Sequence, residues 1–371
     1  MKTYNTYKIA PPATSAGNRL APILKLMLAS RHGHPTHHNL TSLTMKMIRT
    51  LLLLAALTAA FPTPRAMAQI YVTSGAGNSI DTANLDGSNP STLLDFDALF
   101  GNARYDPNGV LFSEGQLFWT DADQAGIYAA GVDGSNPRKL VDLIAVFVDA
   151  DRPVGIVKSG SQLIWADRGA LYTVGLDGSN PRVLIDLRRT ITDKVLFPFG
   201  ITVVGDELIW TASEVFEVGI VRYSFGIFAC GLDGSNPRQL IEYSVETGRP
   251  AEHGFYGIVA AGTQLFWADK IQGAIYTAGL DGSNPRVLID LRATFGGPRY
   301  DPEGIVVFDS LIYWTDDQTN AVYTAGLDGS NPTKLFDSPT GDVEWIAIAP
   351  SSVDPGFIPE RLTLSWCCAP L

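Results

Sequence analysis

Residues 311–332 read LIYWTDDQTNAVYTAGLDGSNP, and stretches of this kind recur along most of the chain. The closing pentapeptide, Asp-Gly-Ser-Asn-Pro, occurs six times, with successive copies 47, 44, 56, 48 and 47 residues apart. This period matches one four-stranded blade of a β-propeller and is too long for leucine-rich or ankyrin repeats. The copies begin at Asp86, Asp133, Asp177, Asp233, Asp281 and Asp328.

Each repeat contains four short apolar segments. In the last repeat these are residues 304–307, 311–316, 321–327 and 334–336. They are rich in β-branched and aromatic residues and are bounded by Gly, Asp, Asn and Pro, which is typical of strands separated by turns. No helical periodicity is present, so the sequence predicts an all-β, six-bladed propeller with four-stranded blades over residues 69–349.

The order of the segments also predicts how the ring closes. The first repeat starts directly at a second strand, residues 70–73, and the last pentapeptide is followed by an extra apolar strand at residues 343–348. We therefore expect this C-terminal strand to complete blade one as its innermost strand. Closure of this kind removes the free strand edges that would otherwise promote aggregation.

The repeat resembles a known motif. Residues 313–316, Tyr-Trp-Thr-Asp, followed by Leu-Asp-Gly-Ser at 327–330, look like the YWTD (class B) repeat of the low-density lipoprotein receptor family, and only residues 70–73 lack the Trp. Receptor propellers of that family are followed by a cysteine-rich module, whereas residues 350–371 form a short tail with only Cys367 and Cys368. The resemblance is therefore closest to single-domain bacterial exported relatives. Variants of the motif occur at residues 118–121, 164–167, 209–212 and 266–269.

A secretory leader is predicted at residues 45–68. A basic start at residues 45–49 precedes an apolar run at 51–61 and then Ala66-Met67-Ala68, which is the pattern of a signal peptide cleaved after Ala68. The apolar run is too short for a membrane span, which needs about 20 residues. Residues 1–44 are interpreted as a disordered extension upstream of the true start. We expect a protein that is secreted, periplasmic or on the cell surface, with no membrane span once the leader is removed.

Charge is distributed unevenly along the chain. Residues 1–68 carry 8 of the 27 basic residues and no acidic residue, which leaves 19 basic and 38 acidic residues, a formal charge of −19, for the rest. This excess of negative charge argues against nucleic acid and anionic membranes as partners. With three cysteines in 371 residues, the fold is expected to depend on its core and not on disulfides, and we expect a monomer.

The repeated turns are interpreted as scaffold, because Asp and Asn accept turn hydrogen bonds and Gly permits positive φ. Binding is expected where the repeats differ. In the resembled family, the residue beside the first Gly of each inner strand lies at the mouth of the central channel. From blade two to blade six these residues are Asn108, Val154, Phe199, Tyr256 and Glu303, with Glu344 as the approximate match in blade one.

This assignment predicts a mouth that is half acidic and half apolar. Glu303, Glu344 and Asn108 come from neighbouring blades and are candidate ligands for Ca²⁺ or another divalent cation. The alternative is a channel mouth that is simply polar and hydrated. The surrounding loops add Arg and Tyr, which recur at binding hot spots, although local ion pairs with nearby Asp would also explain the arginines. The candidate ligand-binding residues are Arg104, Tyr105, Asn108, Arg152, Phe199, Tyr256, Arg299 and Tyr300, and a blade-four insertion at residues 211–226 is expected to overhang them.

Two functions follow from this pattern. The first is an exported, non-enzymatic binding propeller that recognises a protein, peptide or glycan through its loop face. The alternative is a metal-assisted, lactonase-like hydrolase with a cation at the channel mouth. The part of the chain after the leader has only His253 and no G-x-S-x-G or H-E-x-x-H motif, which favours the binding role.

Overall fold

The computed structural model describes residues 68–101, 103–148, 150, 152–188, 195–215, 223–243 and 254–350. These residues belong to one unit, Ala66–Leu371. The predicted extension, all but the last residue of the predicted leader, and the tail beyond Pro350 lie outside the described residues. Those predictions therefore stay predictions.

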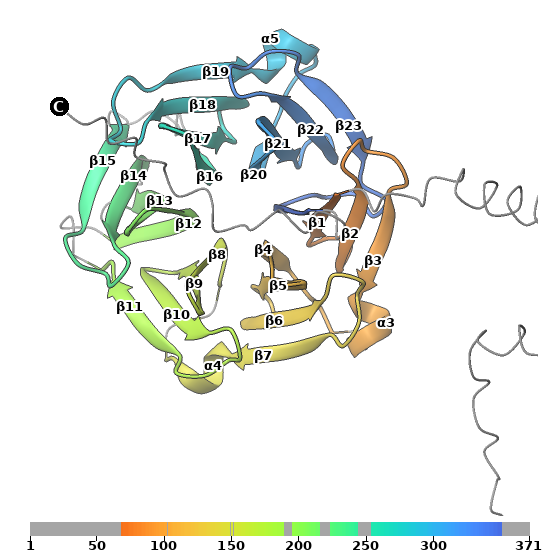
Figure 1. The fold of residues 1–371 in the computed structure, drawn as a ribbon, viewed down its shortest axis with the longest axis vertical. Coiled ribbons are helices and arrows are strands. Elements are labelled where there is room, and N and C mark those ends of the chain that lie inside the picture. The colour runs from red at the N-terminus through yellow and green to blue at the C-terminus, as the bar shows by residue number, and fades with distance from the viewer. Residues whose placement is uncertain are drawn as a thin grey trace, which may run out of the picture. The chain divides into compact units, whose positions relative to one another are not determined.

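The described residues form six four-stranded antiparallel sheets arranged in a ring (Figure 1), which confirms the predicted six-bladed propeller. Figure 1 shows the innermost strands around the centre and the outermost strands at the rim. From the innermost strand outward, blade one is β24 (Ile346–Ala349), β1 (Gln69–Ser74), β2 (Ser79–Asn84) and β3 (Ser91–Asp95); blade two is β4 (Pro107–Ser113), β5 (Gln116–Asp121), β6 (Gly126–Gly131) and β7 (Arg138–Asp142); blade three is β8 (Ile156–Ser159), β9 (Gln162–Asp167), β10 (Ala170–Gly175) and β11 (Arg182–Asp186). Blade four is β12 (Val195–Val204), β13 (Glu207–Val215), β14 (Tyr223–Gly231) and β15 (Arg238–Tyr243); blade five is β16 (Phe255–Ala261), β17 (Gln264–Asp269), β18 (Ala274–Gly279) and β19 (Arg286–Asp290); blade six is β20 (Pro302–Phe308), β21 (Leu311–Asp316), β22 (Ala321–Gly326) and β23 (Thr333–Asp337).

Apolar residues of the strands build the core between the blades. The tryptophans of the second strands in blades two to six are fully buried, and each stacks on an aromatic ring of the third strand. Trp119, for example, lies 5.5 Å from Tyr128 between ring centroids, with 15° between the ring planes. Cys230 is a buried free thiol within the same packing. Such large buried rings contribute roughly 3–5 kcal/mol each, judged from aromatic-to-alanine substitutions in protein cores.

Three short helices, which the strand pattern did not indicate, follow the outermost strands of blades one, two and five. They are α3 (Phe96–Phe100), α4 (Leu143–Val146) and α5 (Leu291–Phe295). In α3 and α5 an aspartate caps the first turn, because Asp95 accepts from the Ala98 N–H and Asp290 from the Ala293 N–H. These helices lead the chain from the rim of one blade toward the inner strand of the next.

The ring closes as predicted. β24 pairs antiparallel with β1, with Val72 opposite Ile346 and Gln69 opposite Ala349. Hydrogen bonds between Thr73 and Glu344 and between Thr73 and Trp345 extend this pairing beyond the strand. Blade one therefore takes its innermost strand from the C-terminal part of the propeller and its other three strands from the N-terminal part.

A buried carboxylate reinforces this closure. Asp81 on β2 is fully buried, and its Oδ2 accepts hydrogen bonds from Ser338 Oγ (2.7 Å), Thr340 Oγ1 (2.7 Å) and the Thr340 N–H (3.3 Å). Ser79 Oγ lies 3.4 Å from the other oxygen. Asp81 thereby ties the start of the propeller to the connection that leads from blade six into β24.

The Asp-Gly-Ser-Asn-Pro turns have the geometry expected of scaffold. In each copy the Asp Oδ1 accepts the N–H of the Ser two residues later, at 2.9 or 3.0 Å, and the side chain is solvent-exposed or nearly so. Hydrogen bonds from the side chain and then from the backbone N–H of this Ser lower the pKa of the six aspartates. Six almost identical turns therefore offer six equivalent small surfaces.

The blade-four insertion is an extension of two strands. β13 and β14 are each nine residues long, whereas the corresponding strands of the other blades have six. The pairing continues from Glu207 opposite Gly231 to Val215 opposite Tyr223. The tip, residues 216–222, lies outside the described residues, so its predicted position over the mouth is untested.

Candidate functional site

The predicted mouth residues occupy β-bulges in the inner strands. In blades two, four, five and six the pairing between the first and second strands slips at one dipeptide, which is Asn108-Gly109, Phe199-Gly200, Tyr256-Gly257 or Glu303-Gly304. A bulge leaves these residues out of the regular ladder and re-aims their side chains. The X-Gly pattern in the sequence is thus a repeated structural device, and the residue before the Gly is free to differ in each blade.

The glycines of these dipeptides allow neighbouring inner strands to approach closely. A Cβ at Gly257 would lie 2.5 Å from the Glu303 carbonyl oxygen, and one at Gly155 would lie 2.5 Å from the Phe199 carbonyl oxygen. Such contacts require the absence of a side chain. The mouth residues therefore follow one another round the ring in the order that the sequence predicted.

Threonines of the second strands hold the same joints in alternate blades. The Oγ1 atoms of Thr120, Thr211 and Thr315 donate to the carbonyl oxygens of the mouth residues in the next blade, which are Val154, Tyr256 and Glu344. Ala166 and Ala268 occupy the corresponding positions in blades three and five. The backbone under the mouth is therefore rigidly held, as a preorganised site requires.

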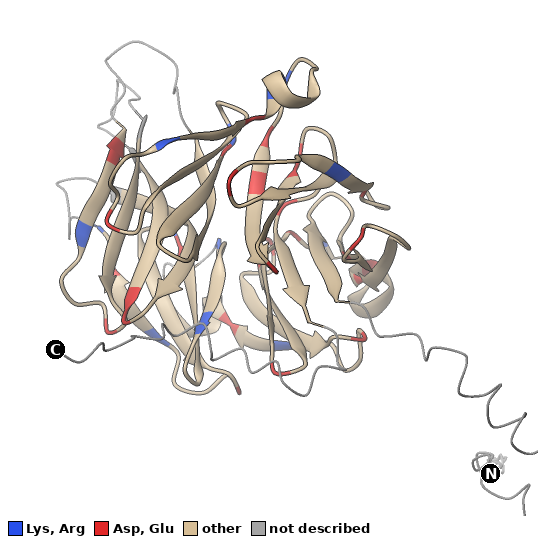
Figure 2. Cartoon of the chain, turned by 45° about the horizontal axis from the view of Figure 1, so that its top comes forward, with Lys and Arg blue, Asp and Glu red and all other residues tan. Residues whose placement is uncertain are grey.

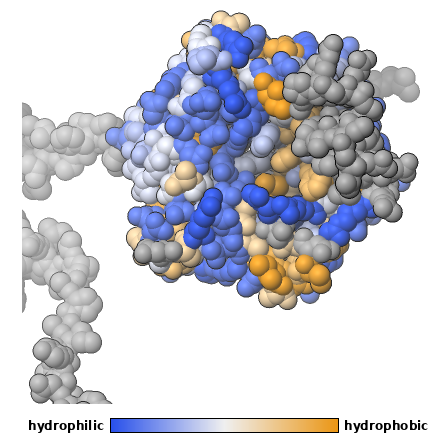
Figure 3. Space-filling model, turned by 180° about the vertical axis from the view of Figure 1, so that it is seen from behind, coloured by the Kyte–Doolittle hydropathy of each residue, from blue (hydrophilic) through white to orange (hydrophobic). Residues whose placement is uncertain are grey.

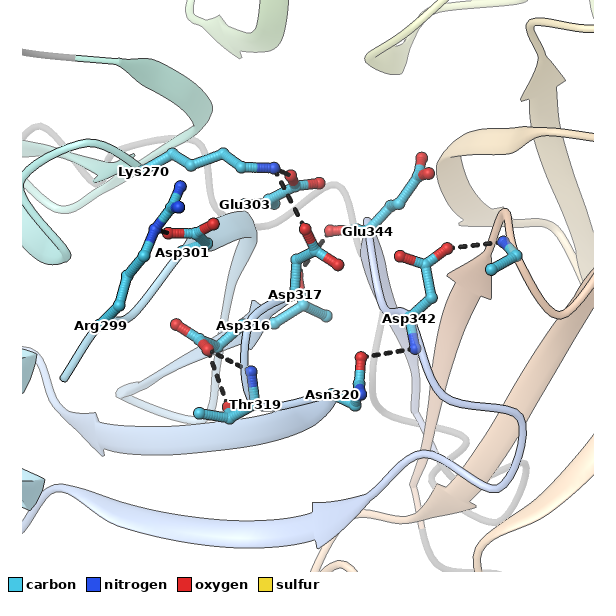
Figure 4. A network of polar contacts seen from close by, with 12 residues as sticks. Lys270, Arg299, Asp301, Glu303, Asp316, Asp317, Thr319, Asn320, Asp342 and Glu344 are labelled. Carbon is cyan, nitrogen blue, oxygen red and sulfur yellow. Dashed lines mark hydrogen bonds and ion pairs between the residues drawn. The ribbon is translucent and has the colours of Figure 1, made fainter. Parts of the chain in front are cut away.

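Five carboxylates lie near one another on the side of the mouth formed by blades six, one and two, and Figure 4 shows four of them, on Glu303, Asp317, Asp342 and Glu344. Three of them converge on Gly75 in the turn between β1 and β2. A Cβ at Gly75 would lie 2.6 Å from Asp106 Oδ1, 2.7 Å from Glu344 Oε1 and 3.4 Å from Asp342 Oδ2. The other two carboxylates belong to Glu303 and Asp317.

Burial and mutual repulsion raise the pKa values of these acids. The pKa of Glu344 is raised well above its ordinary range by burial and then by the charges of Glu303, Asp106 and Asp342. The pKa of Asp342 is raised by burial and by a hydrogen bond with Asp317, and that of Asp106 by burial and by the charge of Asp123. A proton shared within such a group makes one member a neutral hydrogen-bond donor.

One lysine neutralises part of this group. Lys270, in the turn between β17 and β18, forms ion pairs with Glu303 and, at 3.2 Å, with Asp317. These charges raise the pKa of Lys270, which keeps it protonated. Burial raises the pKa of Glu303, and the Lys270 ammonium opposes that shift. Glu303 is only 6% exposed, and the ion pair with Lys270 compensates for the burial of its carboxylate.

The opposite side of the mouth is apolar. Phe199 and Tyr256 stack with 5.0 Å between ring centroids, and both side chains are partly exposed, as is Val154. The Lys270 ammonium lies 5.3 Å from the Tyr256 ring centroid, so the aromatic pair borders the acidic group directly. Figure 3, which views the ring from behind, shows hydrophilic surface on one side of the centre and hydrophobic patches on the other. Acidic and apolar side chains therefore lie next to each other at this end of the channel.

The predicted loop residues divide into two groups. Arg104, Arg152 and Arg299 are exposed and pair with Asp123 (2.7 Å), Asp106 (3.8 Å) and Asp301 (2.6 Å). Of these three ion pairs, Arg299–Asp301 is the local kind that the alternative interpretation expected, whereas Arg104 and Arg152 pair with aspartates distant in the sequence. Exposed pairs of this kind contribute about 0–1 kcal/mol and leave the guanidinium groups accessible.

The two predicted tyrosines lie elsewhere. Tyr105 and Tyr300 are 6% and 8% exposed, and their rings pack against the aromatic residues of blades two and six. The sequence placed them on a binding surface because they adjoin the arginines. In the structure their rings belong to the core, since each also packs against a phenylalanine of the preceding helix, Phe100 of α3 or Phe295 of α5.

Sequence reasoning missed Lys270, Asp317 and Asp342. Lys270 and Asp317 directly follow the aspartate that ends the second strand, and the same position holds Gly75 in blade one, Ala122 in blade two and Arg168 in blade three. The residue after the second strand varies from blade to blade, as the bulge residue does. A comparison of the repeats at this position would therefore have indicated Lys270 and Asp317. Asp342 lies in the connection before β24, outside the repeat, and no repeat comparison could indicate it.

Asn108, Glu303 and Glu344 are brought to the same mouth but do not form a ligand set. Asn108 Nδ2 donates to the Asp106 carbonyl oxygen, and Glu303 is engaged with Lys270. Within the described ranges, no three His, Cys, Asp or Glu side chains are arranged to hold a metal ion. In the same part of the chain, no helix has the length and apolar character needed to cross a membrane.

These features define a six-bladed β-propeller whose divergent residues gather at one end of the central channel. Among solved structures, the chain is similar to a chain from the crystal structure of a nidogen/laminin complex, with a TM-score of 0.58 and 20% identity over 76% of this chain and 98% of that one. It is also similar to regucalcin, a calcium-binding protein from Agrobacterium tumefaciens strain C58, with a TM-score of 0.49 and 14% identity over 64% of this chain and 76% of that one. No protein-family model and no curated protein matches the chain. At these identities the similarity establishes the propeller fold alone.

Proposed function

We propose that the protein is an exported binding propeller of the YWTD kind, which recognises a protein, peptide or glycan ligand through the mouth of its channel and the loops around it. The observation that carries this proposal is the contrast between a uniform, hydrogen-bonded backbone and side chains that differ in each blade. A site that distinguishes ligands must be asymmetric, and the mouth is the asymmetric end of the ring.

The composition of the mouth supports a binding role. A partly exposed aromatic pair, buried carboxylates and accessible arginines lie at one end of the ring, and few such groups are needed to orient a ligand. Figure 2 shows how acidic residues outnumber basic ones along the ribbon, which supports the exclusion of nucleic acid as a partner.

Peptide and glycan arrays probed with the labelled chain lacking residues 1–68 test this proposal. Ligands found in this way should lose binding to Phe199→Ala and Glu303→Gln but retain binding to Asp133→Ala and Asp281→Ala, which alter the repeated turns. The reverse pattern in folded variants would contradict the proposal, because it would place the binding surface at the repeated turns and not at the mouth.

Calcium titration of the same protein distinguishes the enzymatic alternative. A tight, stoichiometric divalent cation that is lost in Glu303→Gln or Glu344→Gln would favour a metal-assisted hydrolase. Absence of binding at millimolar calcium would favour the binding propeller.

A further inference from the structure

The apolar part of the mouth is a surface without a partner inside the described structure. Phe199 and Tyr256 lie in the bulges of β12 and β16, Val154 lies just before β8 in the adjacent blade, and all three side chains are partly exposed. The carbonyl groups of all three residues lie close to glycines of the preceding blades, which fixes their backbones. A rigid, exposed aromatic pair of this kind is typical of the anchor point of an interface.

Charge identifies what the occupant must carry. The mouth carries five carboxylates. Among the described residues, Lys270 and Arg152 form ion pairs with members of this group. The five acids are Asp106, Glu303, Asp317, Asp342 and Glu344. Tyr256 joins the two parts of the mouth, because its ring stacks on Phe199 and also lies against the Lys270 ammonium; burial and then the charge of Glu303 raise the pKa of its hydroxyl. The apolar surface therefore ends at a group of acids with more negative than positive charge.

The protein itself shows how this mouth holds a cation. The Lys270 ammonium lies between the Glu303 and Asp317 carboxylates and against the Tyr256 ring, while its methylene stem is largely buried. Asp106, Asp342 and Glu344 form a second set of carboxylates on the other side of Glu303, and no lysine occupies it among the described residues. Arg152 lies near this second set: its Nη2 atom is 3.8 Å from Asp106 Oδ2, and its side chain is more than half exposed.

We propose that the mouth binds a lysine or arginine side chain of a partner protein, presented by a peptide segment whose apolar neighbours pack on Phe199 and Tyr256. The cationic group lies among Asp106, Asp342 and Glu344, where it completes the neutralisation that Lys270 begins. This inference rests on the proposed function and specifies its ligand class. The peptide source is favoured over a free amine because the aromatic surface adjoins the acids and would remain uncovered by an amine alone.

Two features favour this occupant. A lysine or arginine side chain can reach the acids on its methylene stem while the rest of the peptide packs on the stacked Phe199 and Tyr256 rings. Displacement of Arg152 from Asp106 has little cost, since exposed ion pairs contribute about 0–1 kcal/mol.

Pools of fluorescent pentapeptides test the proposal on the chain lacking residues 1–68. The central residue is Lys, Arg, norleucine or Glu, and each neighbour is a mixture of Ala, Leu and Phe. The Lys and Arg pools should bind at least about tenfold more tightly than the norleucine pool, because a charged hydrogen bond is lost with the ammonium. Butylamine should bind far more weakly than the Lys pool. Equal binding of the Lys and norleucine pools, or no binding of the Lys and Arg pools, would overturn the proposal, as would butylamine binding as tightly as the Lys pool.

Matched variants locate the interaction. Asp106→Asn and Glu344→Gln each replace a mouth acid that can ionise beside a bound cation with an amide that cannot, and should weaken the Lys pool by about tenfold without affecting the norleucine pool. Asp133→Asn makes the same replacement in a repeated turn and should leave both pools unchanged, and thermal melts confirm that each variant is folded. If Phe199→Ala abolishes binding while both charge variants are silent, the mouth binds peptides but the cationic chemistry is wrong. If only Asp133→Asn weakens binding, both this inference and the proposed function fail.

Discussion

The propeller has two kinds of joint between its blades. Between blades three and six, glycines such as Gly200 and Gly257 press against the backbone of the next inner strand. At the seam, where β24 enters blade one, Trp345 takes the place of the glycine, because its N–H donates to Thr73 Oγ1 as the Gly304 N–H donates to Thr315 Oγ1. The continuous joints combine these close backbone contacts with threonine hydrogen bonds in alternate blades, whereas Asp81 and its hydroxyl partners hold the seam.

This difference links closure of the ring to the candidate site. Four of the five mouth carboxylates come from blades six and one, and Asp342 and Glu344 lie in the segment that leads directly into β24. The carboxylate group is therefore complete only when the C-terminal strand has joined blade one. The apolar part of the mouth, in blades three to five, depends on continuous blades and needs no such event.

Removal of residues 342–371 should give the largest effect. The truncated chain loses β24, Asp342 and Glu344, so the apolar face of blade one and the inner edge of β1 are exposed. We expect cooperative unfolding to be lost or moved to a much lower temperature, as measured by calorimetry. Removal of residues 352–371 alone is the control and should change little. A truncated protein that is folded and equally stable would show that the seam does not hold the ring.

Asp81→Ala should weaken the seam without removing a strand. The substitution leaves Ser338 and Thr340 without their buried acceptor, and we expect the free energy of unfolding to fall by about 2–4 kcal/mol. Asp86→Ala removes an exposed turn carboxylate from the same blade and should cost less than about 1 kcal/mol. Equal losses in urea denaturation would argue against a special role for Asp81.

Gly257→Ala tests the continuous joints. A Cβ there would lie 2.5 Å from the Glu303 carbonyl oxygen and 2.9 Å from the Ile305 nitrogen, so the inner strands of blades five and six must separate. We expect a loss of about 1–3 kcal/mol, the usual cost of overpacking. Trp345→Ala, at the matching position of the seam, introduces no clash and should cost stability only through lost packing. Unchanged stability of Gly257→Ala would show that the joint is not close-packed.

Glu344→Gln should produce the smallest change, and one of opposite sign. Burial and neighbouring acids raise the pKa of Glu344, so the folded protein retains a proton at pH values where the unfolded chain has released it. The contribution of this group to stability therefore declines as pH rises above the ordinary glutamate range. The variant should be more stable than the parent at pH 8, and the difference should shrink toward pH 4 in denaturation curves. A less stable variant at pH 8 would contradict the raised pKa.

Comparison of repeats predicted most of the fold and part of the site. The period of the pentapeptide indicated six blades, and the single extra strand at residues 343–348 indicated the closure, because a strand with no partner in its own repeat must pair elsewhere. The mouth positions, such as Phe199, Tyr256 and Glu303, were found because each precedes the first Gly of an inner strand. The same local reasoning failed for Tyr105 and Tyr300, since adjacency in the chain does not reveal which side chain turns into the core.

The sequence by itself determined the number of blades, the order of strands and the segregation of acidic and apolar residues round the ring, because these properties repeat with a fixed period or follow from chain order. Only the tertiary structure decided that Lys270 neutralises Glu303 and that Asp106, Asp342 and Glu344 converge on Gly75. Those contacts join residues that are far apart in the sequence, such as Gly75 and Glu344, which are 269 positions apart. The physical reason is that charges interact through space over a few ångströms, and only closure of the ring brings the two ends of the propeller within that distance.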